Sequence, residues 1–184
     1  MTEGISVLAV SGSLRRGSFN TAALRAAADL APQGMSIEVV ALHGIPNFDA
    51  DVEAAGFPAE VAALREGIAA ADALLIATPE YNWSIPGVLK NALDWASRGG
   101  EDSPLRGKPA AILGAGGRLG TARAQTHLRE ILRHNQVRVV GLPEVLIDSA
   151  ETRFDAAGRL TDERFRSQIR RLLEALRDEA ERRG

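Results

Sequence analysis

The chain has 184 residues, 45% of them hydrophobic, and 24 acidic against 22 basic side chains give it a formal net charge of −2. This length suffices for one well-buried core, so we expect a single domain over residues 1–184. The near balance of charge predicts no nucleic-acid partner, and the absence of cysteine excludes disulfides, thiolate nucleophiles and thiolate metal ligands.

The N-terminal segment predicts neither a signal peptide nor a membrane span. Residues 1–4 carry no basic side chain, and the apolar run Ile5–Val10 is too short for either purpose. The lack of cysteine fits a reducing compartment. We therefore expect a cytoplasmic protein without a membrane partner.

Short apolar runs alternate with segments of helical periodicity along the chain. Each run is bounded by glycine, proline or polar residues, as buried strands are. The predicted strands are 5–10, 36–42, 73–77, 110–113 and 144–147. A first helix is predicted at 20–31, and a second from the apolar stripe Phe57, Val61, Leu64, Ile68 and Ala71. Three more are predicted after Pro86, around 128–132, and after the cap signal 161–163. Residues 98–108 and 148–160 are expected to be exposed loops.

This alternation predicts an α/β fold in which a doubly wound, five-stranded parallel sheet carries helices on both faces. The order 2-1-3-4-5, which is flavodoxin-like, suits the length best. In that order strands 1, 3 and 4 are neighbours, so the loops that follow them converge at one edge of the sheet. Ligands of such sheets bind at this edge.

The loop after the first strand reads S-G-S-L-R-R-G-S-F-N (11–20) and leads into a helix. Unpaired N–H groups at a helix start attract anions, the hydroxyls of Ser13 and Ser18 can donate, and the Arg15 guanidinium can clamp oxygens. The alternative is that Ser18 or Asn20 only caps the helix while the arginines are solvated. Neither G-x-G-x-x-G nor G-K-[ST] is present, which leaves a phosphate monoester as the predicted anion.

The other two loops suit a flat ligand. The single tyrosine, Tyr81, and both tryptophans, Trp83 and Trp95, lie close together in sequence around the second loop (78–87), which Pro79 and Pro86 stiffen. For Trp95, inside a predicted helix, a core position is the better interpretation. The glycines of the third loop (114–121) either admit a flat ligand close to the backbone or simply make a turn.

No metal site is predicted. His43 ends a strand, while His127 and His134 lie on one helix without carboxylates at ligand spacing.

With these pieces together, the chain resembles the NADPH-dependent FMN reductase family of the flavodoxin-like fold, and within it the chromate and quinone reductase branch. The resemblance rests on G-S-L-R-R-G-S-F-N (12–20) and P-E-Y-N-W-S-I-P-G-V-L-K-N-A-L-D-W (79–95). It continues through L-R-G-K-P (105–109) and G-T-A-R-A-Q-T-H-L-R-E-I-L (120–132).

The resemblance implies that the chain binds FMN and takes hydride from NADPH or NADH. It implies that Ser13, Arg15, Ser18 and Asn20 hold the phosphate and that residues 79–82 wrap the isoalloxazine, largely through backbone groups. The implied cofactor-binding residues are Ser13, Arg15, Ser18, Phe19, Asn20, Pro79, Glu80, Tyr81, Asn82, Ala115 and Gly116.

Three positions depart from the family's pattern. Gly114-Ala115-Gly116 stands where relatives often carry a serine, so only main-chain contact is implied there. Trp83 replaces a second tyrosine, and Thr126 replaces an aromatic that some relatives use between subunits. A homodimer or homotetramer is nevertheless the assembly that the resemblance implies.

In such an enzyme the flavin carries out the transfer of hydride and electrons, so no catalytic side chain is assigned. The expected acceptors are quinones, chromate, azo compounds or similar small molecules. A preference for NADPH requires a cation for the 2′-phosphate, and Arg16, Arg98, Arg106, Arg118 and Arg123 are all candidates.

The alternative function is a flavodoxin-like electron carrier, which the near-neutral charge and Arg15 argue against. A phosphoacceptor receiver domain is set aside, because Ser11-Gly12-Ser13 stands where its acidic cluster belongs.

Overall fold

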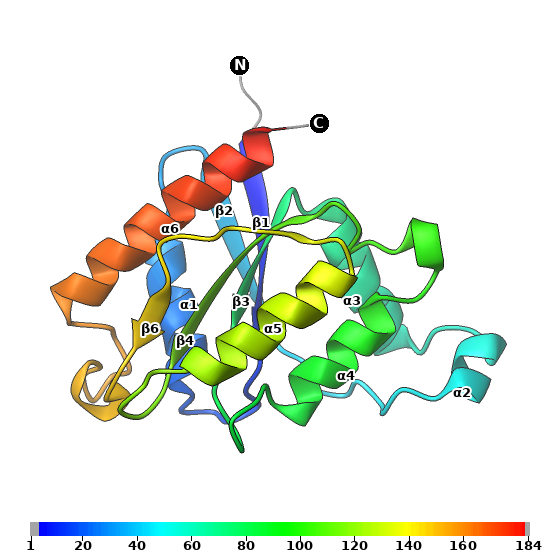
Figure 1. Ribbon diagram of the computed structural model, residues 1–184, viewed down its shortest axis with the longest axis horizontal. Coiled ribbons are helices and arrows are strands. Elements are labelled where there is room, and N and C mark those ends of the chain that lie inside the picture. Colours follow the sequence, from blue (N-terminus) through cyan, green and yellow to red (C-terminus); the bar gives the residue numbers. More distant parts are fainter. Residues whose placement is uncertain (1–3, 183–184) are drawn as a thin grey trace.

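The computed structural model describes residues 4–182, in which a parallel sheet lies between two layers of helices (Figure 1). The strands are β1 (Ile5–Ser11), β2 (Met35–Val40), β3 (Ala73–Ala77), β4 (Pro109–Ala115), β5 (Arg138–Val139) and β6 (Val145–Ile147). The helices are α1 (Phe19–Asp29), α2 (Ala50–Ala55), α3 (Ala59–Ala70), α4 (Gly87–Ala96), α5 (Ala122–His134) and α6 (Glu163–Glu181), with short 3₁₀ turns at Gly100–Asp102 and Ala150–Thr152.

The predicted strand order is confirmed, with the fifth position divided in two. The sheet runs β2-β1-β3-β4-β5, and β6 also pairs with β4. Pro109 and Ala110 of β4 lie opposite β5, whereas Leu113–Ala115 lie opposite β6. Pro143, in the link between β5 and β6, has no N–H for a ladder, which is one reason why this edge is not a single strand.

Side chains alternate between two apolar cores, because successive strand residues point to opposite faces. Val7 and Ala9 of β1 face a core closed by α1 and α6. Leu8 and Val10 face a second core closed by α3, α4 and α5. The sheet is therefore covered on both faces, as the continuous apolar runs predict.

Two residues of the predicted helical stripe lie outside its helix, because Ala71 is the C-cap of α3 and Phe57 precedes it. Val61, Leu64 and Ile68 are buried on α3 as expected, but Phe57 precedes the helix and is 41% exposed. Pro58 follows Phe57 and disfavours helical backbone there, so the helix begins only at Ala59.

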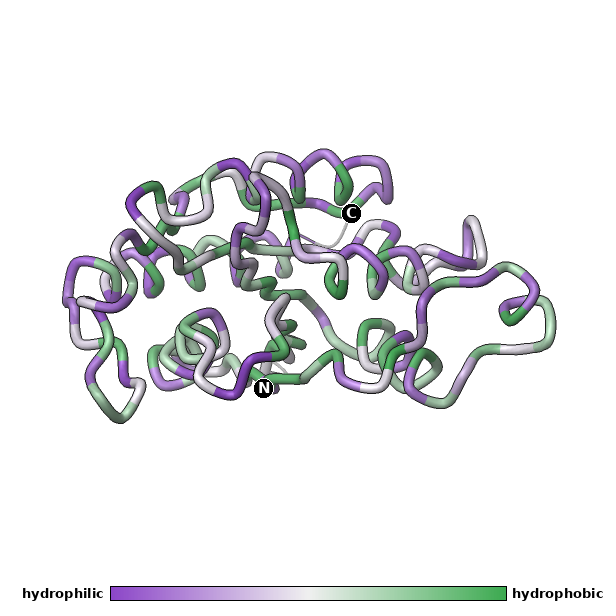
Figure 2. Tube along the Cα trace, turned by 90° about the horizontal axis from the view of Figure 1, so that it is seen from below, coloured by the Kyte–Doolittle hydropathy of each residue, from purple (hydrophilic) through white to green (hydrophobic). Residues whose placement is uncertain are grey.

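The segment that carries α2 extends away from the sheet, to the right in Figures 1 and 2. The residues before α2 are anchored to the rest of the protein by Trp95 of α4. Trp95 is fully buried and donates its indole N–H to the Pro46 carbonyl at 2.8 Å. The Phe48 ring packs edge-on against Trp95, with centroids 4.9 Å apart. The predicted core position of Trp95 is confirmed.

Residues 148–160 are not an exposed loop, contrary to the sequence-based expectation. Ala150, Phe154 and Leu160 are buried in the core under α1 and α6. In the other predicted loop, Leu105 is fully buried as well. Both segments are rich in charged residues, and a few apolar residues within them pack into the core.

The strands all run toward one edge of the sheet, here called the carboxyl edge, which lies at the bottom in Figure 1. β1 begins and α6 ends at the opposite, amino edge, where Arg138 of β5 donates to the carbonyls of Glu179 and Arg182. Among the helices of residues 4–182, none combines the length and apolar character needed to cross a bilayer.

Candidate functional site

The connections after β1, β3 and β4 meet at the carboxyl edge, as the predicted order requires. We call them the first (Gly12–Ser18), second (Thr78–Pro86) and third (Gly116–Gly120) connections. Gly12 donates its N–H to Ala77 at 2.8 Å, and Thr78 donates to Leu113 at 3.1 Å. Figure 2 looks onto this edge, where hydrophilic and hydrophobic segments are interleaved.

The first connection is a tight turn that caps α1. Ser18 donates its N–H to the Arg15 carbonyl at 3.1 Å, and its hydroxyl oxygen accepts from the N–H of Thr21 at 3.3 Å. Helix capping by Ser18 is thus confirmed. A hydroxyl that accepts one bond still has its own proton to donate, so capping leaves Ser18 able to bind an anion.

A row of backbone donors in this connection is left without a protein acceptor. Within residues 4–182, no acceptor bonds the N–H groups of Leu14, Arg16, Gly17, Phe19 and Asn20. Those of Phe19 and Asn20 begin α1, where the helix dipole adds positive potential. The Arg15 side chain is exposed beside them, its guanidinium 5.5 Å from the centre of the Phe19 ring. These groups can together hold a phosphate.

Asn20 ties the first connection to the third. It is 3% exposed; its Nδ2 donates to the Ala115 carbonyl and its Oδ1 accepts from the Ala115 N–H, both at 2.9 Å. The side chain therefore positions the end of β4 against the start of α1. Its contact with a phosphate stays a prediction.

The second connection contains a strained hairpin. Tyr81 and Ser84 exchange backbone hydrogen bonds of 3.0 Å in both directions, and the two residues between them, Asn82 and Trp83, have φ values of 49° and 66°. Asparagine tolerates this left-handed conformation, whereas a bulky side chain such as tryptophan rarely adopts it. Such strain is concentrated at functional sites. Tyr81 and Trp83 are 51% and 67% exposed.

Glu80 fastens this hairpin to α5 with its carboxylate. Its Oε2 accepts from the N–H groups of Arg123 at 3.0 Å and Ala124 at 3.2 Å, and its Oε1 accepts from the Arg123 guanidinium at 3.2 Å. Thr121 gives α5 no side-chain cap, so Glu80 supplies one from another loop. The Arg123 guanidinium also lies 4.3 Å from the centre of the Trp83 ring. Sequence reasoning missed these contacts; the only signal was a helix start without its own acidic cap.

Because the Glu80 side chain points into the protein, the second connection offers a ligand mainly its backbone, from Pro79 to Asn82, and the Tyr81 ring. The same hairpin is held on its other side by His127, whose Nδ1 lies 3.0 Å from the Ser84 hydroxyl. This arrangement fits the expectation that residues 79–82 contact a ligand through main-chain groups.

Two glycines, one at the end of β4 and one at the start of the third connection, are needed for close packing. A Cβ on Gly114 would overlap the Thr121 hydroxyl, and one on Gly116 would overlap the Gly120 carbonyl. The Ala115 N–H is bonded to Asn20, and the Gly116 N–H donates to Ile147 at 3.0 Å. Contact of Ala115 and Gly116 with a ligand, which stays a prediction, would thus run through atoms other than these donors.

Residues 148–160 brace the third connection from behind. The N–H groups of Ser149 and Ala150 donate to Gly117 and Gly116 at 3.1 and 2.9 Å. Arg153 holds this brace by donating to Asp148 at 2.8 Å and to Asp162 at 3.0 Å. The hydrogen bond from Arg153 holds the pKa of Asp148 below its ordinary value, and the bond to Asp148 raises the pKa of Arg153.

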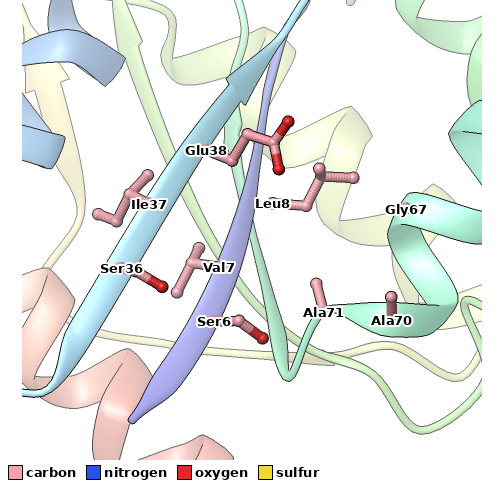
Figure 3. Close-up of a pocket in the computed structure, with 9 residues that line it drawn as sticks. All are labelled: Ser6, Val7, Leu8, Ser36, Ile37, Glu38, Gly67, Ala70 and Ala71. Carbon is pink, nitrogen blue, oxygen red and sulfur yellow. The ribbon is translucent and has the colours of Figure 1, made fainter.

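Two hollows of the surface lie beside β2 and α3, away from the three connections. One of about 270 Å³ lies between β1, β2 and α3, where Leu8 and Glu38 extend toward the helix (Figure 3). The other, of about 400 Å³, continues from it and shares Leu8, Glu38 and Gly67. Neither is lined by a predicted site residue, and no row of free donors faces them. The carboxyl edge is therefore the better candidate site.

A metal-ion site has no ligand set in the described part of the chain, where no three histidine, aspartate or glutamate side chains gather suitably.

Comparison with known proteins identifies the family of this chain. The model of the NADPH-dependent FMN reductase family matches residues 5–152. The chain belongs to that family. It is 58% identical over 177 residues to an NAD(P)H-dependent FMN reductase of Pseudomonas aeruginosa, covering 96% of this chain and 95% of that one.

Two other known proteins are also similar to this chain. A quinone reductase of Escherichia coli K12 is 46% identical over 149 residues, which cover 79% of each chain. The solved flavoenzyme NAD(P)H:acceptor oxidoreductase FerB of Paracoccus denitrificans superposes with a TM-score of 0.88 at 33% identity, covering 98% of this chain and 99% of that one. The family's cofactors are FMN and NAD(P)H, and this chain is an oxidoreductase.

Proposed function

We propose that this FMN reductase binds FMN at the carboxyl edge through the first and second connections, with residues 1–184 forming one FMN-binding domain. It would take hydride from NADPH and pass electrons to a quinone. The observation that carries the proposal is the set of N–H groups beside the Arg15 side chain that have no acceptor within residues 4–182, namely those of Leu14, Arg16, Gly17, Phe19 and Asn20.

When bound, FMN supplies the redox chemistry, accepting hydride from NAD(P)H and giving up electrons to the acceptor. The chain's own task is to bind and orient. Arg15, Ser13 and Ser18 would hold the phosphate together with the free N–H groups, while the backbone of the second connection would hold the ring. Asn20 and Glu80 fix these two connections to the rest of the fold, so the donors are in place before the cofactor binds.

A planar, largely apolar acceptor suits the surroundings of this site. Four exposed hydrophobic side chains lie on the three connections: Leu14 (41%), Tyr81 (51%), Trp83 (67%) and Leu119 (51%). Such a group of apolar side chains marks a binding surface. A quinone matches it better than chromate, which is a small hydrated anion. The E. coli relative that is named a quinone reductase supports the same choice. Azo compounds are a second planar class to test.

The decisive experiment is the visible spectrum of the protein after FMN is added and excess FMN is removed, followed by anaerobic NADPH. We expect retained flavin that bleaches with NADPH and is reoxidised by a benzoquinone faster than by chromate. Protein that retains no flavin would overturn the proposal. Flavin that neither NADPH nor NADH bleaches would instead favour the electron carrier.

Arg15→Ala tests the phosphate site within that experiment. Each charge-assisted hydrogen bond to a phosphate contributes about 1.5–3 kcal/mol, so the Kd for FMN should rise about tenfold or more. Arg106→Ala is the matched control, because Arg106 lies at the amino edge and pairs only with the exposed Glu101 at 3.4 Å. Equal FMN affinity in both variants would count against the assignment.

We also propose a homodimer or homotetramer in the cytoplasm, on the family resemblance. Light scattering that shows only a monomer at micromolar concentration would contradict the assembly.

A further inference from the structure

We infer that Arg118, at the tip of the third connection, contacts the 2′-phosphate of NADPH and gives the enzyme its preference for NADPH over NADH. The inference rests on the proposed function. Any of five arginines could carry this role on sequence grounds, and the structure separates them by position and by what their guanidinium groups already bind.

Arg98 and Arg106 lie at the wrong edge of the sheet. α4 begins at the carboxyl edge and ends at Ala96, so Arg98, just beyond it, is at the amino edge. Its Nε donates to the Asp94 carbonyl at 3.0 Å, and its guanidinium lies 4.9 Å from the centre of the Phe48 ring. Arg106 precedes β4 at the same edge. Neither can reach a nicotinamide cofactor held at the carboxyl edge.

Arg123 lies at the correct edge but is already engaged. Its guanidinium is ion-paired with Glu80 at 3.2 Å and stacked on Trp83 at 4.3 Å. Since the Glu80 carboxylate also caps α5, recruiting Arg123 to a phosphate would break an ion pair and a stack that hold the hairpin. Its charge is largely offset where it stands.

Arg16 belongs to the connection that the FMN phosphate would use. It follows Arg15 directly, and the free N–H groups around it are the ones assigned to that phosphate. A second phosphate in the same turn would be repelled by the first, because each carries a charge of about −1.5 to −2 at neutral pH. Arg16 is therefore a poor choice for the 2′-phosphate.

Arg118 remains, and its surroundings suit an anion. Its side chain is exposed and forms no ion pair or hydrogen bond with any residue of the described range 4–182. The backbone N–H groups of Arg118 and Leu119 also lack a protein acceptor within that range. An uncommitted guanidinium beside two free N–H groups can bind a phosphate from several directions.

The support under Arg118 is rigid. Gly120 donates its N–H to Gly117 at 2.9 Å to close the turn, and Ser149 and Ala150 fasten the turn to the brace. Asn20 holds the end of β4, on which the turn stands, against the start of α1. The backbone that carries Arg118 is thus held beside the candidate flavin site, and the unbonded side chain is left to meet a phosphate there.

The test compares Arg118→Ala and Arg118→Glu with Arg16→Ala and with the remote control Arg106→Ala. The first readout is the ratio of kcat/KM for NADPH to kcat/KM for NADH. The second is inhibition by 2′,5′-ADP and by 5′-AMP, which differ only in the 2′-phosphate. We expect Arg118→Ala to lower the ratio about tenfold or more and to raise the Ki for 2′,5′-ADP by a similar factor, with the Ki for AMP nearly constant. Arg118→Glu should lower the ratio further.

An unchanged ratio in Arg118→Ala would overturn the inference, as would a selective loss in Arg16→Ala instead. So would a wild-type enzyme that binds 2′,5′-ADP no more tightly than AMP. These outcomes differ from failure of the proposed function, in which neither NADPH nor NADH bleaches retained flavin.

Discussion

The polar groups of the amino edge are bonded to one another, whereas a row of them at the carboxyl edge is not. At the amino edge Arg65 donates to the carbonyls of Trp95, Ala96 and Arg98 at 2.9–3.0 Å, which closes the end of α4. Lys108 donates to the carbonyls of Ala69 and Ala71 and so closes the end of α3. Burial lowers the pKa of both Arg65 and Lys108.

At the carboxyl edge the bonded groups are those that fix the loops, namely Asn20, Glu80 and Arg153. Other N–H groups of these loops are unbonded in the described range: those of Leu14, Arg16, Gly17, Phe19 and Asn20, and those of Arg118 and Leu119. This contrast agrees with the proposal that a ligand binds at the carboxyl edge. Substitutions at the two edges should therefore fail in different ways.

Arg65→Ala should have the largest effect on stability. Three carbonyls would lose a charged donor, although the Trp95 carbonyl still accepts from the Arg98 N–H and the Ala96 carbonyl from the Ser103 hydroxyl. We expect the loss of these charge-assisted hydrogen bonds to lower the unfolding free energy by roughly 2–3 kcal/mol in total. FMN retention should be unchanged, because the carboxyl edge is untouched. Denaturant unfolding and flavin titration of the same preparation measure the two effects. Arg65→Lys, which keeps one charged donor, should lose about half as much. Weaker flavin binding in Arg65→Ala at unchanged stability would contradict this difference between the two edges.

Asn20→Ala should produce a smaller loss of stability together with weaker flavin binding. It removes two buried hydrogen bonds to Ala115, and the variant should lose about 1–2 kcal/mol. Because these bonds join the first and third connections, the Kd for FMN should also rise. Asn20→Asp is the control, since its carboxylate can still accept from the Ala115 N–H but cannot donate to the Ala115 carbonyl. A variant with wild-type flavin affinity would show that the tie does not shape the site.

Asp148→Asn should have the smallest effect and should appear only in acid. The pKa of Asp148 is lowered in the folded protein by the hydrogen bond from Arg153, so its contribution is present above the ordinary value near 3.8 and disappears as pH falls through the folded value. The variant lacks this carboxylate, so its stability should fall less steeply than that of the wild type when the pH is lowered below about 5. Thermal melts at several pH values measure this dependence. An unaltered acid limb would mean that the brace does not depend on this ion pair.

The sheet could be predicted from sequence because its strands are buried on both faces and read as unbroken apolar runs. β5 has only two residues, and such a short strand leaves no periodic signal. The sequence did not predict α2 for a similar reason: its six residues bury none of their side chains, so they form no apolar stripe. Phe57 misled because its spacing matched the stripe although Pro58 stood between it and the helix.

The candidate site was predictable in its backbone and less so in its side chains. The turn at Ser18 and the anion-binding start of α1 follow from local rules of helix capping. The partners of Asn20 and Glu80 lie 95 and 43 residues away, and no local rule reaches across such separations. The glycines at 114 and 116 were open to two interpretations, and only the position of Thr121 and Gly120 decided for close packing.

The placement of both chain ends has a practical consequence. β1 starts at Ile5 on the amino edge and α6 ends there at Glu181, opposite the candidate cofactor site (Figure 1). A fusion to an NADPH-regenerating dehydrogenase, or tethering to an electrode through an N- or C-terminal tag, should leave the path of cofactor and acceptor unobstructed. Attachment at the amino edge is therefore separated from the candidate cofactor site at the carboxyl edge.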